Sequence, residues 1–347
     1  MRRLTVLSIA FPFAPVTADP VGGAEQVLSH LDRALLAGGH RSIVIAAEGS
    51  KPAGELIAIP QPRGEIGQDE WACAHEYLRH VIPEVLRTRR VDLLHMHGLD
   101  YHSYLPPPGV PVLATLHMSA AFYAPEALAP ERPRTWINTV SRHQQELLAV
   151  RSSRHVGAIE NGVPLGPVDN RRRKRAYALA VGRICPEKGF HLAIDAAKLA
   201  GLPLGLIGHV FSYSQHQQYF DREIRPRLDR RRRWLGPVSG LRKWRLLRSA
   251  RCLLVPSLVP ETASLVAREA LAAGTPVVAF PNGALSEVVD PGRTGFLVRG
   301  VREMAAAMLQ AADIDPQACR EAARERFSVG RMAEEYFALY DRLLRVA

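Results

Sequence analysis

The sequence predicts an α/β protein of two domains, each built on a parallel β-sheet. The chain has 347 residues, more than one hydrophobic core usually serves, since domains contain about 100–200 residues. Short apolar runs alternate with longer amphipathic segments from end to end, which is the pattern of strands and crossover helices. A polar, basic stretch near the middle interrupts this alternation and separates two halves of similar length.

The first half opens on an apolar run that imitates a secretory signal, because Arg2 and Arg3 precede it. Pro12 and Pro15 follow closely and no small-residue cleavage site closes the run, so we interpret it as a buried first strand. The predicted strands of this half are Leu4–Phe11, Ser42–Ala46, Leu93–Met96, Val112–Leu116, Trp136–Val140 and Gly157–Ile159, and the predicted helices are Ala24–Leu36, Glu70–Thr88 and Ser141–Ala149.

The alternation restarts after the basic stretch. We predict an N-terminal α/β domain over residues 1–168, a basic linker over 169–175, a C-terminal α/β domain over 176–328, and a last helix at 329–347 that packs back towards the N-terminal domain. The strands of the second half are Tyr177–Val181, Leu204–Ile207, Arg233–Leu235, Cys252–Pro256, Pro276–Phe280 and Gly295–Val298, and its helices are Gly189–Ala200, Gln215–Asp229, Leu241–Ser249, Ser264–Ala273, Val301–Ala312, Pro316–Phe327 and Val329–Val346.

The formal net charge of +11 comes largely from arginine, gathered at 171–175, 230–233 and 242–245. Such clusters bind anionic lipid headgroups, acidic glycans or nucleic acid, or else they lie on solvated faces. No nucleic-acid recognition module is present, so nucleic acid is not an expected partner. The four cysteines lie far apart and indicate a reducing compartment with isolated core thiols. We expect a soluble cytoplasmic protein, with peripheral contact at the inner face of the membrane as one reading of the arginines.

The most informative segment carries Glu261 in a loop after a predicted strand and Glu269 in the helix that follows. Thr262 or Ser264 can cap this helix. Open α/β sheets bind ligands at the carboxyl ends of their strands, and a helix start can receive a diphosphate. A carboxylate one turn into the helix can accept hydrogen bonds from a ribose diol, and one before the helix can reach a sugar. The amides expected at the diphosphate are those near Ser264, Leu265 and Val266.

Each half of the chain has a glycine-containing loop directly after its first predicted strand. Gly182 and Gly189 bracket a strand-to-helix turn that places Arg183 and Lys188 where a diphosphate leaving group would sit. No Walker pattern surrounds Lys188, which disfavours an ordinary ATPase. In the first half, paired glycines at 22 and 23 allow backbone amides to approach a ligand at a helix start.

Histidines cluster at two neighbouring strand ends of the first half. Alternation places His95 and His97 on one face of their strand, and adjacent strand ends can bring His97 and His117 together. These are either satisfied core histidines or site residues. A metal site is not expected, because no carboxylate or thiol ligand has accompanying spacing.

Together these motifs resemble glycosyltransferase family 4, the retaining group 1 enzymes of the GT-B fold. The resemblance is strongest from Val181 to Val298, where two glutamates separated by seven residues precede Ala-Leu-Ala-Ala-Gly-Thr-Pro-Val-Val at 270–278. It implies two Rossmann-like domains whose parallel sheets face each other across a cleft. The family usually has a bulky residue and a glycine where this chain has Ala263 and Ser264, which leaves the sugar preference open.

The resemblance also implies roles for individual residues. Glu261 would contact the donor sugar and Glu269 the ribose, while Arg183 and Lys188 would bind the diphosphate. Glycines 22 and 23 would face donor and acceptor, and His117 would lie near the reacting sugar. The loop Gly236–Ser239, with Val238, would read the nucleobase; Asn161–Val163 resembles the turn before the linker; Phe280–Glu287 resembles a Gly-Gly-x-x-Glu segment with Ala284 in place of a glycine, so the role of Glu287 stays open.

The function implied is transfer of a hexose, with retention, from a nucleoside-diphosphate sugar to a hydroxyl of a glycan, lipid or small-molecule acceptor. A UDP-sugar is favoured and a GDP-sugar comes next; no other cofactor and no metal are expected. Asp313 and Asp315 spell the metal motif of a different fold, but they sit between predicted helices. The alternatives are a GT-B epimerase or sugar-nucleotide hydrolase, and a non-catalytic binder of anionic lipid or polymer.

Overall fold

The computed structural model describes residues 2–346, apart from positions 19, 21, 63, 65, 150–153 and 167–173. The chain forms two compact units, the first made of Met1–Gly162 with Val329–Ala347 and the second of Val163–Ser328. Each unit contains one parallel β-sheet, which confirms the predicted α/β class. Of the predicted linker, positions 169–173 lie outside the described residues, and so does the arginine run 171–173.

The sheet of the first unit has the order β3-β2-β1-β4-β5-β6-β7, with every described pair parallel. One strand was not predicted, β3, because its short run lies at the sheet edge and is mostly half-buried. The bounds are β1 Thr5–Ile9, β2 Arg41–Ala47, β3 Glu55–Ile59, β4 Leu93–Met96, β5 Val112–Leu116, β6 Thr135–Thr139 and β7 His155–Ala158.

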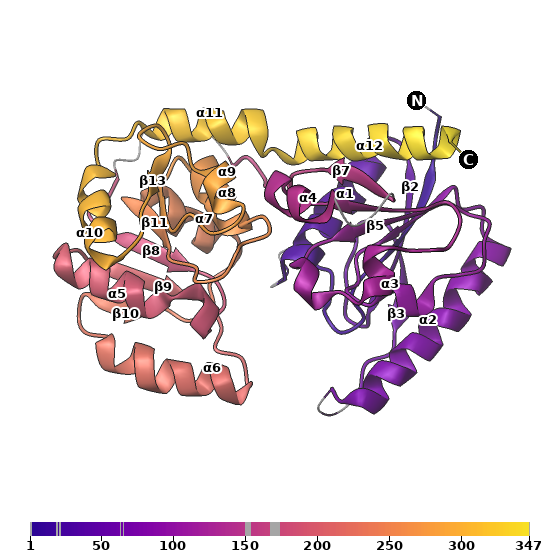
Figure 1. The fold of residues 1–347 in the computed structure, drawn as a ribbon, viewed down its shortest axis with the longest axis horizontal. Helices are drawn as coiled ribbons and strands as arrows, with labels where there is room; N and C mark the ends of the chain where they lie inside the picture. The colour runs from indigo at the N-terminus through magenta and orange to yellow at the C-terminus, as the bar shows by residue number, and fades with distance from the viewer. Residues whose placement is uncertain are drawn as a thin grey trace. The chain divides into compact units, whose positions relative to one another are not determined.

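Helices cover both faces of this sheet. Alternation along β1 and β2 sends Leu7 and Ile43 to the face packed by α2, while Val44 packs with Leu28 of α1 on the opposite face. Figure 1 shows α12 running beside α1. The helices are α1 Gly23–Ala37, α2 Gln68–Thr88, α3 Pro125–Leu128, α4 Arg142–Ala149 and α12 Val329–Arg345.

Helix α12 contributes buried tyrosines to the core of the first unit. Tyr340 is fully buried, and its hydroxyl lies 2.8 Å from Nδ1 of His95. The Tyr336 hydroxyl lies 3.2 Å from Thr115 Oγ1 and 3.3 Å from Nδ2 of Asn138. These hydroxyls extend a buried network on β4, β5 and β6, in which Thr115 Oγ1 lies 2.7 Å from His95 Nε2 and donates to Asn138 Oδ1 at 2.7 Å.

The sheet of the second unit has the order β10-β9-β8-β11-β12-β13 and is also parallel throughout its described pairs. Helices α5 and α10 pack against each other over one face, and α8 and α11 over the other (Figure 1). The strands are β8 Ala178–Val181, β9 Leu204–Ile207, β10 Arg232–Trp234, β11 Cys252–Val255, β12 Val277–Ala279 and β13 Gly295–Leu297; the helices are α5 Phe190–Leu199, α6 Ser214–Tyr219, α7 Gly240–Ser249, α8 Leu265–Ala272, α9 Leu285–Val288, α10 Val301–Gln310 and α11 Pro316–Arg326.

Two predictions about these elements were wrong. The helix expected over Gln215–Asp229 is three short pieces, α6, a π-helix at Phe220–Ile224 and a 3₁₀ turn at Arg225–Arg227. Pro226 lies in that last turn, and a proline lacks the N–H that a continuing α-helix needs. Cys73 is exposed rather than a core thiol, because α2 buries the stripe through Ala74 instead; the other three cysteines are buried.

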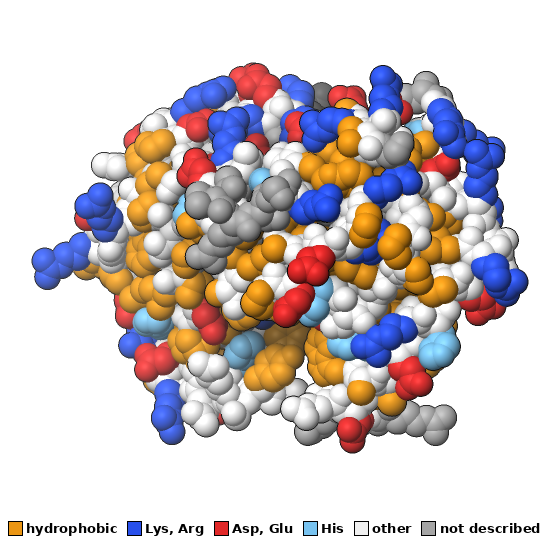
Figure 2. Space-filling model, turned by 45° about the vertical axis from the view of Figure 1, so that its right-hand side comes forward, with side chains coloured by type: hydrophobic (Ala, Val, Ile, Leu, Met, Phe, Trp, Pro, Cys, Tyr) orange, Lys and Arg blue, Asp and Glu red, His pale blue; other side chains and the backbone are white. Residues whose placement is uncertain are grey.

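Basic side chains are spread over the surface. On the face in Figure 2, Lys and Arg side chains occur both singly and side by side, with Asp and Glu among them. Within the cluster 230–233, Arg232 pairs with Asp229 and Arg231 donates to the Gly201 carbonyl at 2.6 Å, while Arg233 is exposed. No helix in the described part of the chain combines the length and apolar character that a bilayer crossing requires.

Candidate functional site

The second unit has its topological switch point between β8 and β11. Strand order runs outward from these two strands in opposite directions, so the loops that follow them diverge and leave a crevice at their carboxyl ends, the usual ligand position in open α/β sheets. The loop after β8 carries Arg183 and Lys188, and the loop after β11 carries Glu261. The topology therefore brings the two strongest sequence motifs to one sheet edge.

Lys188 and Glu261 form an ion pair across this edge. Nζ of Lys188 donates to Glu261 Oε1 at 2.6 Å, and the Ser257 hydroxyl donates to the same oxygen. The side chains are 26% and 11% exposed, so the pair is screened less than a surface pair but stays open to solvent on the lysine side. The cation and the carboxylate therefore lie together at the sheet edge, with the lysine within reach of solvent.

Glu261 is also fixed through its backbone. Its N–H donates to the Asn282 carbonyl at 3.3 Å, and its carbonyl accepts from Ala284 N–H at 2.9 Å. The Asn282 side chain donates to the Ser257 carbonyl at 2.6 Å. The segment that resembles Gly-Gly-x-x-Glu thus positions the loop of the first glutamate, and Ser257 and Asn282 are supporting residues that the sequence did not reveal.

Gly189 brings the two loops into contact. Its φ of 62° is left-handed, and a Cβ there would lie 2.2 Å from the Pro256 carbonyl oxygen. Beside it, Leu258 N–H donates to the Glu187 carbonyl at 2.8 Å. A glycine is therefore required at this position by both conformation and space.

Helix α8 begins directly after the Glu261 loop, with Ser264 as its N-cap residue. The prediction that Thr262 or Ser264 caps the helix by its side chain was wrong, because Ser264 has a left-handed backbone, φ 49° and ψ 67°, and its hydroxyl makes no capping bond. That hydroxyl is buried without a hydrogen-bond partner among the described residues. The amides of Leu265 and Val266 lie in the first turn, where a helix supplies no acceptors.

Glu269 lies one turn into α8 and is 7% exposed. Lys243 of α7 donates to its Oε1 at 2.8 Å. The sequence placed Lys243 in an arginine-rich surface cluster, whereas the structure gives this lysine a buried carboxylate as partner. Nothing in the local pattern could show the pairing, because it joins two different helices.

The remaining predicted residues of this unit lie beside these pairs. Arg183 is exposed at the end of β8. Val238 is buried in the loop that enters α7, where Gly236 has a φ of 71° and its carbonyl accepts from Gly208 N–H at 3.0 Å. Asp315 caps α11 by accepting from Gln317 N–H at 2.8 Å, so the discounted Asp-Ile-Asp letters have a structural role.

The first unit has its own switch point between β1 and β4. Gly22 is the N-cap of α1, and Gly23 opens that helix. A Cβ on Gly22 would lie 1.8 Å from Oε2 of Glu25, so the missing side chain leaves room for this carboxylate. Burial raises the pKa of Glu25.

The three histidines lie at the ends of β4 and β5. His95 is a satisfied core residue, since Tyr340 contacts one ring nitrogen and Thr115 Oγ1 lies 2.7 Å from the other. His97 Nδ1 lies 3.0 Å from Nε2 of His117, and their rings stack at 5.3 Å. Burial lowers the pKa of His117 to about 4 and that of His97 well below its ordinary value, with the neighbouring histidines adding to the effect at His97.

The structure thus groups the predicted site residues by unit. Lys188, Glu261, Ser264 and Glu269 lie at the switch point of the second sheet, with Arg183 beside them. Glycines 22 and 23 and His117 belong to the first unit.

Comparison with known proteins identifies both halves. The model described as Glycosyltransferase Family 4 matches residues 21–167, and the model described as Glycosyl transferases group 1 matches residues 175–313. Together the two matches cover most of the chain.

Curated relatives match over nearly their full length. A protein named glycogen synthase from Mycobacterium tuberculosis is 27% identical over 92% of this chain and 89% of its own. A protein named D-inositol 3-phosphate glycosyltransferase from Pseudarthrobacter chlorophenolicus is 26% identical over 86% of this chain and 84% of its own.

Solved structures share the fold across both units. AviGT4, described as a glycosyltransferase involved in avilamycin A biosynthesis, has a TM-score of 0.71 at 25% identity and covers 99% of each chain. Sucrose-phosphate synthase from Thermosynechococcus elongatus has a TM-score of 0.80 at 18% identity, over 99% of this chain and 100% of the other. With both family models and these relatives in agreement, the chain belongs to the family 4, group 1 glycosyltransferases, enzymes of the GT-B fold.

Proposed function

We propose that this enzyme transfers a hexose from a nucleoside-diphosphate sugar to an acceptor hydroxyl with retention of configuration. The observation that carries the proposal is the grouping of Lys188, Glu261 and the start of α8 at the switch point of the second sheet. An extended nucleotide sugar requires a cation for its diphosphate, a carboxylate for its sugar hydroxyls and helix amides for its phosphate oxygens.

In the proposed reaction the donor diphosphate displaces the resting contacts of the site. Lys188 leaves Glu261 for the diphosphate, Arg183 adds a second cation, and Glu261 then accepts hydrogen bonds from sugar hydroxyls. The glycosidic C–O bond breaks with its electron pair on the diphosphate, whose charge the two cations offset without a metal ion at that position. The acceptor oxygen bonds to the same face of the sugar carbon and its proton passes to a diphosphate oxygen.

The donor we favour is a UDP-sugar. HepE from Anabaena, which shares the fold with a TM-score of 0.74 at 18% identity over 98% of this chain and all of its own, has been solved with UDP-glucose. In the second unit, Glu269 would accept both hydroxyls of the ribose, and the loop at Val238 would contact the base. Glycines 22 and 23 and His117 of the first unit would serve the donor and acceptor sugars.

Thermal unfolding with UDP, GDP, ADP and dTDP tests the donor. A nucleotide at a hundred times its dissociation constant stabilises the protein by about 2.7 kcal/mol, and we expect UDP to give the largest rise in melting temperature. Arg183→Ala and Lys188→Ala should lose most of that rise, whereas Arg302→Ala, an exposed arginine on α10, should keep it. A protein that responds to none of the four nucleotides would contradict the donor proposal.

Product analysis tests the reaction against its rivals. A transferase forms more product when an acceptor glycan, lipid or small alcohol is added, and the new linkage keeps the anomeric configuration of the donor. An epimerase or hydrolase would release an epimer or free sugar at a rate that no acceptor changes. The acceptor that stimulates turnover identifies its chemical class.

Peripheral contact with an anionic membrane on the cytoplasmic side stays a prediction. Arg242 and Arg245 are exposed on α7, next to Leu241, which is 72% exposed. We expect sedimentation with vesicles that contain anionic phospholipid, reduced in an Arg242→Gln, Arg245→Gln double variant. Equal sedimentation with neutral vesicles would contradict it.

A further inference from the structure

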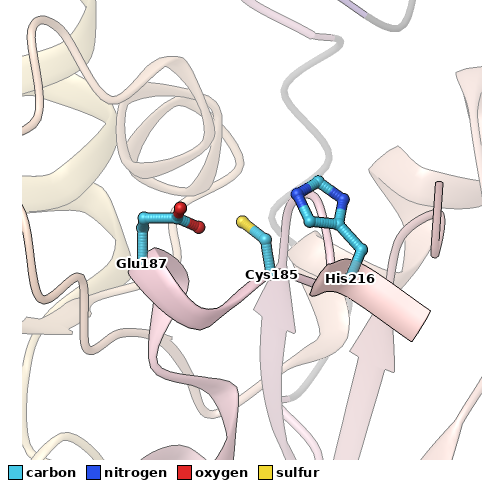
Figure 3. A group of neighbouring side chains, drawn as sticks. All are labelled: Cys185, Glu187 and His216. Atoms are coloured by element: carbon cyan, nitrogen blue, oxygen red, sulfur yellow. The ribbon is translucent and has the colours of Figure 1, made fainter. Parts of the chain in front are cut away.

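Three chemically distinct side chains meet beside the loop after β8. The ligand atoms of Cys185, Glu187 and His216 all lie within 4.8 Å of one another. In Figure 3 the Glu187 carboxylate and the His216 ring flank the Cys185 sulfur, with one ring nitrogen directed towards it. Cys185 and His216 are buried and Glu187 is half-buried.

Local structure fixes each of these residues. Cys185 has an extended backbone and precedes the 3₁₀ turn Pro186–Lys188, so the chain doubles back and Glu187 lies near the sulfur. His216 comes from α6, a different element, and is 8% exposed. Its ring lies against Tyr213 with centroids 5.2 Å apart, which holds the imidazole in place.

The hydrogen bonding of the group is incomplete. Nδ1 of His216 is buried and has no partner among the described residues. The Cys185 thiol lies 3.6 Å from the Arg183 carbonyl, a weak contact for sulfur, and also hydrogen-bonds to the Glu187 carboxylate, so the capacity left unused is on the imidazole. A buried imidazole beside a thiol and a carboxylate, with polar capacity left unused, is the situation that a bound cation resolves.

The donor set selects the kind of cation. Thiolate, imidazole and carboxylate together suit zinc, whereas magnesium and calcium prefer oxygen ligands alone. Zinc bonds of about 2.0–2.3 Å place tetrahedral ligand atoms roughly 3.3–3.6 Å apart. Side-chain rotations that shorten the distances between the three ligand atoms by about 1 Å would reach that spacing, because each ligand atom lies at the end of a rotatable side chain.

We propose that Cys185, Glu187 and His216 bind one zinc ion, with a water molecule in the fourth position. On binding, the Cys185 thiol releases its proton to solvent as the sulfur–zinc bond forms, and the charges of thiolate and carboxylate balance the two charges of the ion. Because Glu187 precedes Lys188 directly, the ion ties α6 to the segment that carries Arg183 and Lys188. The role is to fix that segment rather than to contact the donor diphosphate.

The site does not depend on the proposed donor. Its ligands differ from the residues assigned to the nucleotide sugar, and zinc binding is measured with no nucleotide present. A parent protein that binds no zinc but responds to UDP would contradict the metal site alone. One that binds zinc but responds to no nucleotide would contradict the donor proposal alone.

Metal titration of the full chain tests the site. The protein is first freed of metal by dialysis against a chelator, and zinc is then titrated in competition with a fluorescent zinc indicator. We expect one equivalent to bind, and Cys185→Ser and His216→Ala each to weaken binding by more than the 10- to 100-fold that loss of an outer ligand partner costs. Cys73→Ser and His209→Ala, which change an exposed cysteine and an exposed histidine, are the matched controls and should bind as the parent does.

Cobalt substitution keeps the proposal testable even where a variant fails to fold. Cobalt(II) bound to the parent protein should show the absorption band of a thiolate-to-cobalt charge transfer and the visible bands of a tetrahedral ion. Absence of the thiolate band, or zinc binding that survives in both Cys185→Ser and His216→Ala, would overturn the assignment.

Discussion

Replacement of Ser264 by glycine should stabilise the protein. Ser264 holds a left-handed backbone with φ 49°, a conformation that costs an L-residue about 1–2 kcal/mol and glycine almost nothing. The residue is 7% exposed, and its hydroxyl has no hydrogen-bond partner among the described residues. An unsatisfied buried hydroxyl costs about 1–3 kcal/mol. Glycine loses more backbone entropy on folding, which offsets about 0.5–1 kcal/mol.

The net gain expected for Ser264→Gly is about 2 kcal/mol in the free energy of unfolding. For a unit of this size that corresponds to a rise of roughly 4–8 °C in melting temperature. Ser264→Ala separates the two contributions, because it removes the hydroxyl and keeps the left-handed strain. We expect alanine to recover about 1 kcal/mol and glycine the rest.

Urea denaturation of the three proteins without ligand provides the measurement. A glycine variant less stable than the parent would refute the strain account, and an alanine variant equal to the glycine variant would assign the whole effect to the hydroxyl. Nucleotide affinity should rank the proteins the other way. A hydroxyl that donates to a charged diphosphate contributes about 1.5–3 kcal/mol, so both variants should bind the nucleotide at least tenfold more weakly than the parent.

Three further outcomes follow from the two units. Glu269→Gln should weaken nucleotide affinity at least tenfold in an equilibrium titration, because it removes the carboxylate proposed for the ribose; unchanged affinity would exclude that role. Gly189→Ala should lower the free energy of unfolding by about 2–4 kcal/mol through strain and a backbone clash, whereas Gly39→Ala, also left-handed at φ 78° but with open space around it, should cost less than half as much. Between pH 6.5 and about 4 the unfolded chain binds protons that buried His117 does not, so stability should fall across that window by about 3 kcal/mol from this residue. His117→Gln should make the fall smaller, while His95 and His97, whose pKa values burial also lowers, retain their share; a parent protein with a flat profile would refute the burial argument.

Strand positions in the buried sheets could be predicted because parallel strands covered on both faces are continuous apolar runs. The strands at Leu93–Met96, Val112–Leu116 and Leu204–Ile207 have the predicted bounds. The edge strand β3 was not predicted because only part of it is buried. The helix expected over Gln215–Asp229 is not continuous, and a proline lies in its last short turn. Local pattern predicts an element best where one environment acts on all of it.

The candidate site could be predicted only as far as its motifs are local. Glu261, Glu269 and Lys188 stand in recognisable segments, and the fold places them at one sheet edge. Their partners Ser257, Lys243 and Asn282, and the meeting of His216 with Cys185, depend on contacts between elements that no spacing in the sequence encodes. The left-handed conformation of Ser264 could not be foreseen either, because serine rarely adopts it.

The tyrosines of α12 set an order in which the units can be completed during synthesis. Residues 163–328 are made before α12, so the whole second unit can fold while the first still lacks its final helix. Until Tyr336 and Tyr340 arrive, Nδ1 of His95 lacks its hydroxyl partner, and Thr115 and Asn138 have only each other and their strand neighbours in what will be a buried core. The first unit is therefore completed after the second, and a chain that stops short of α12 leaves a buried histidine nitrogen without its tyrosine partner.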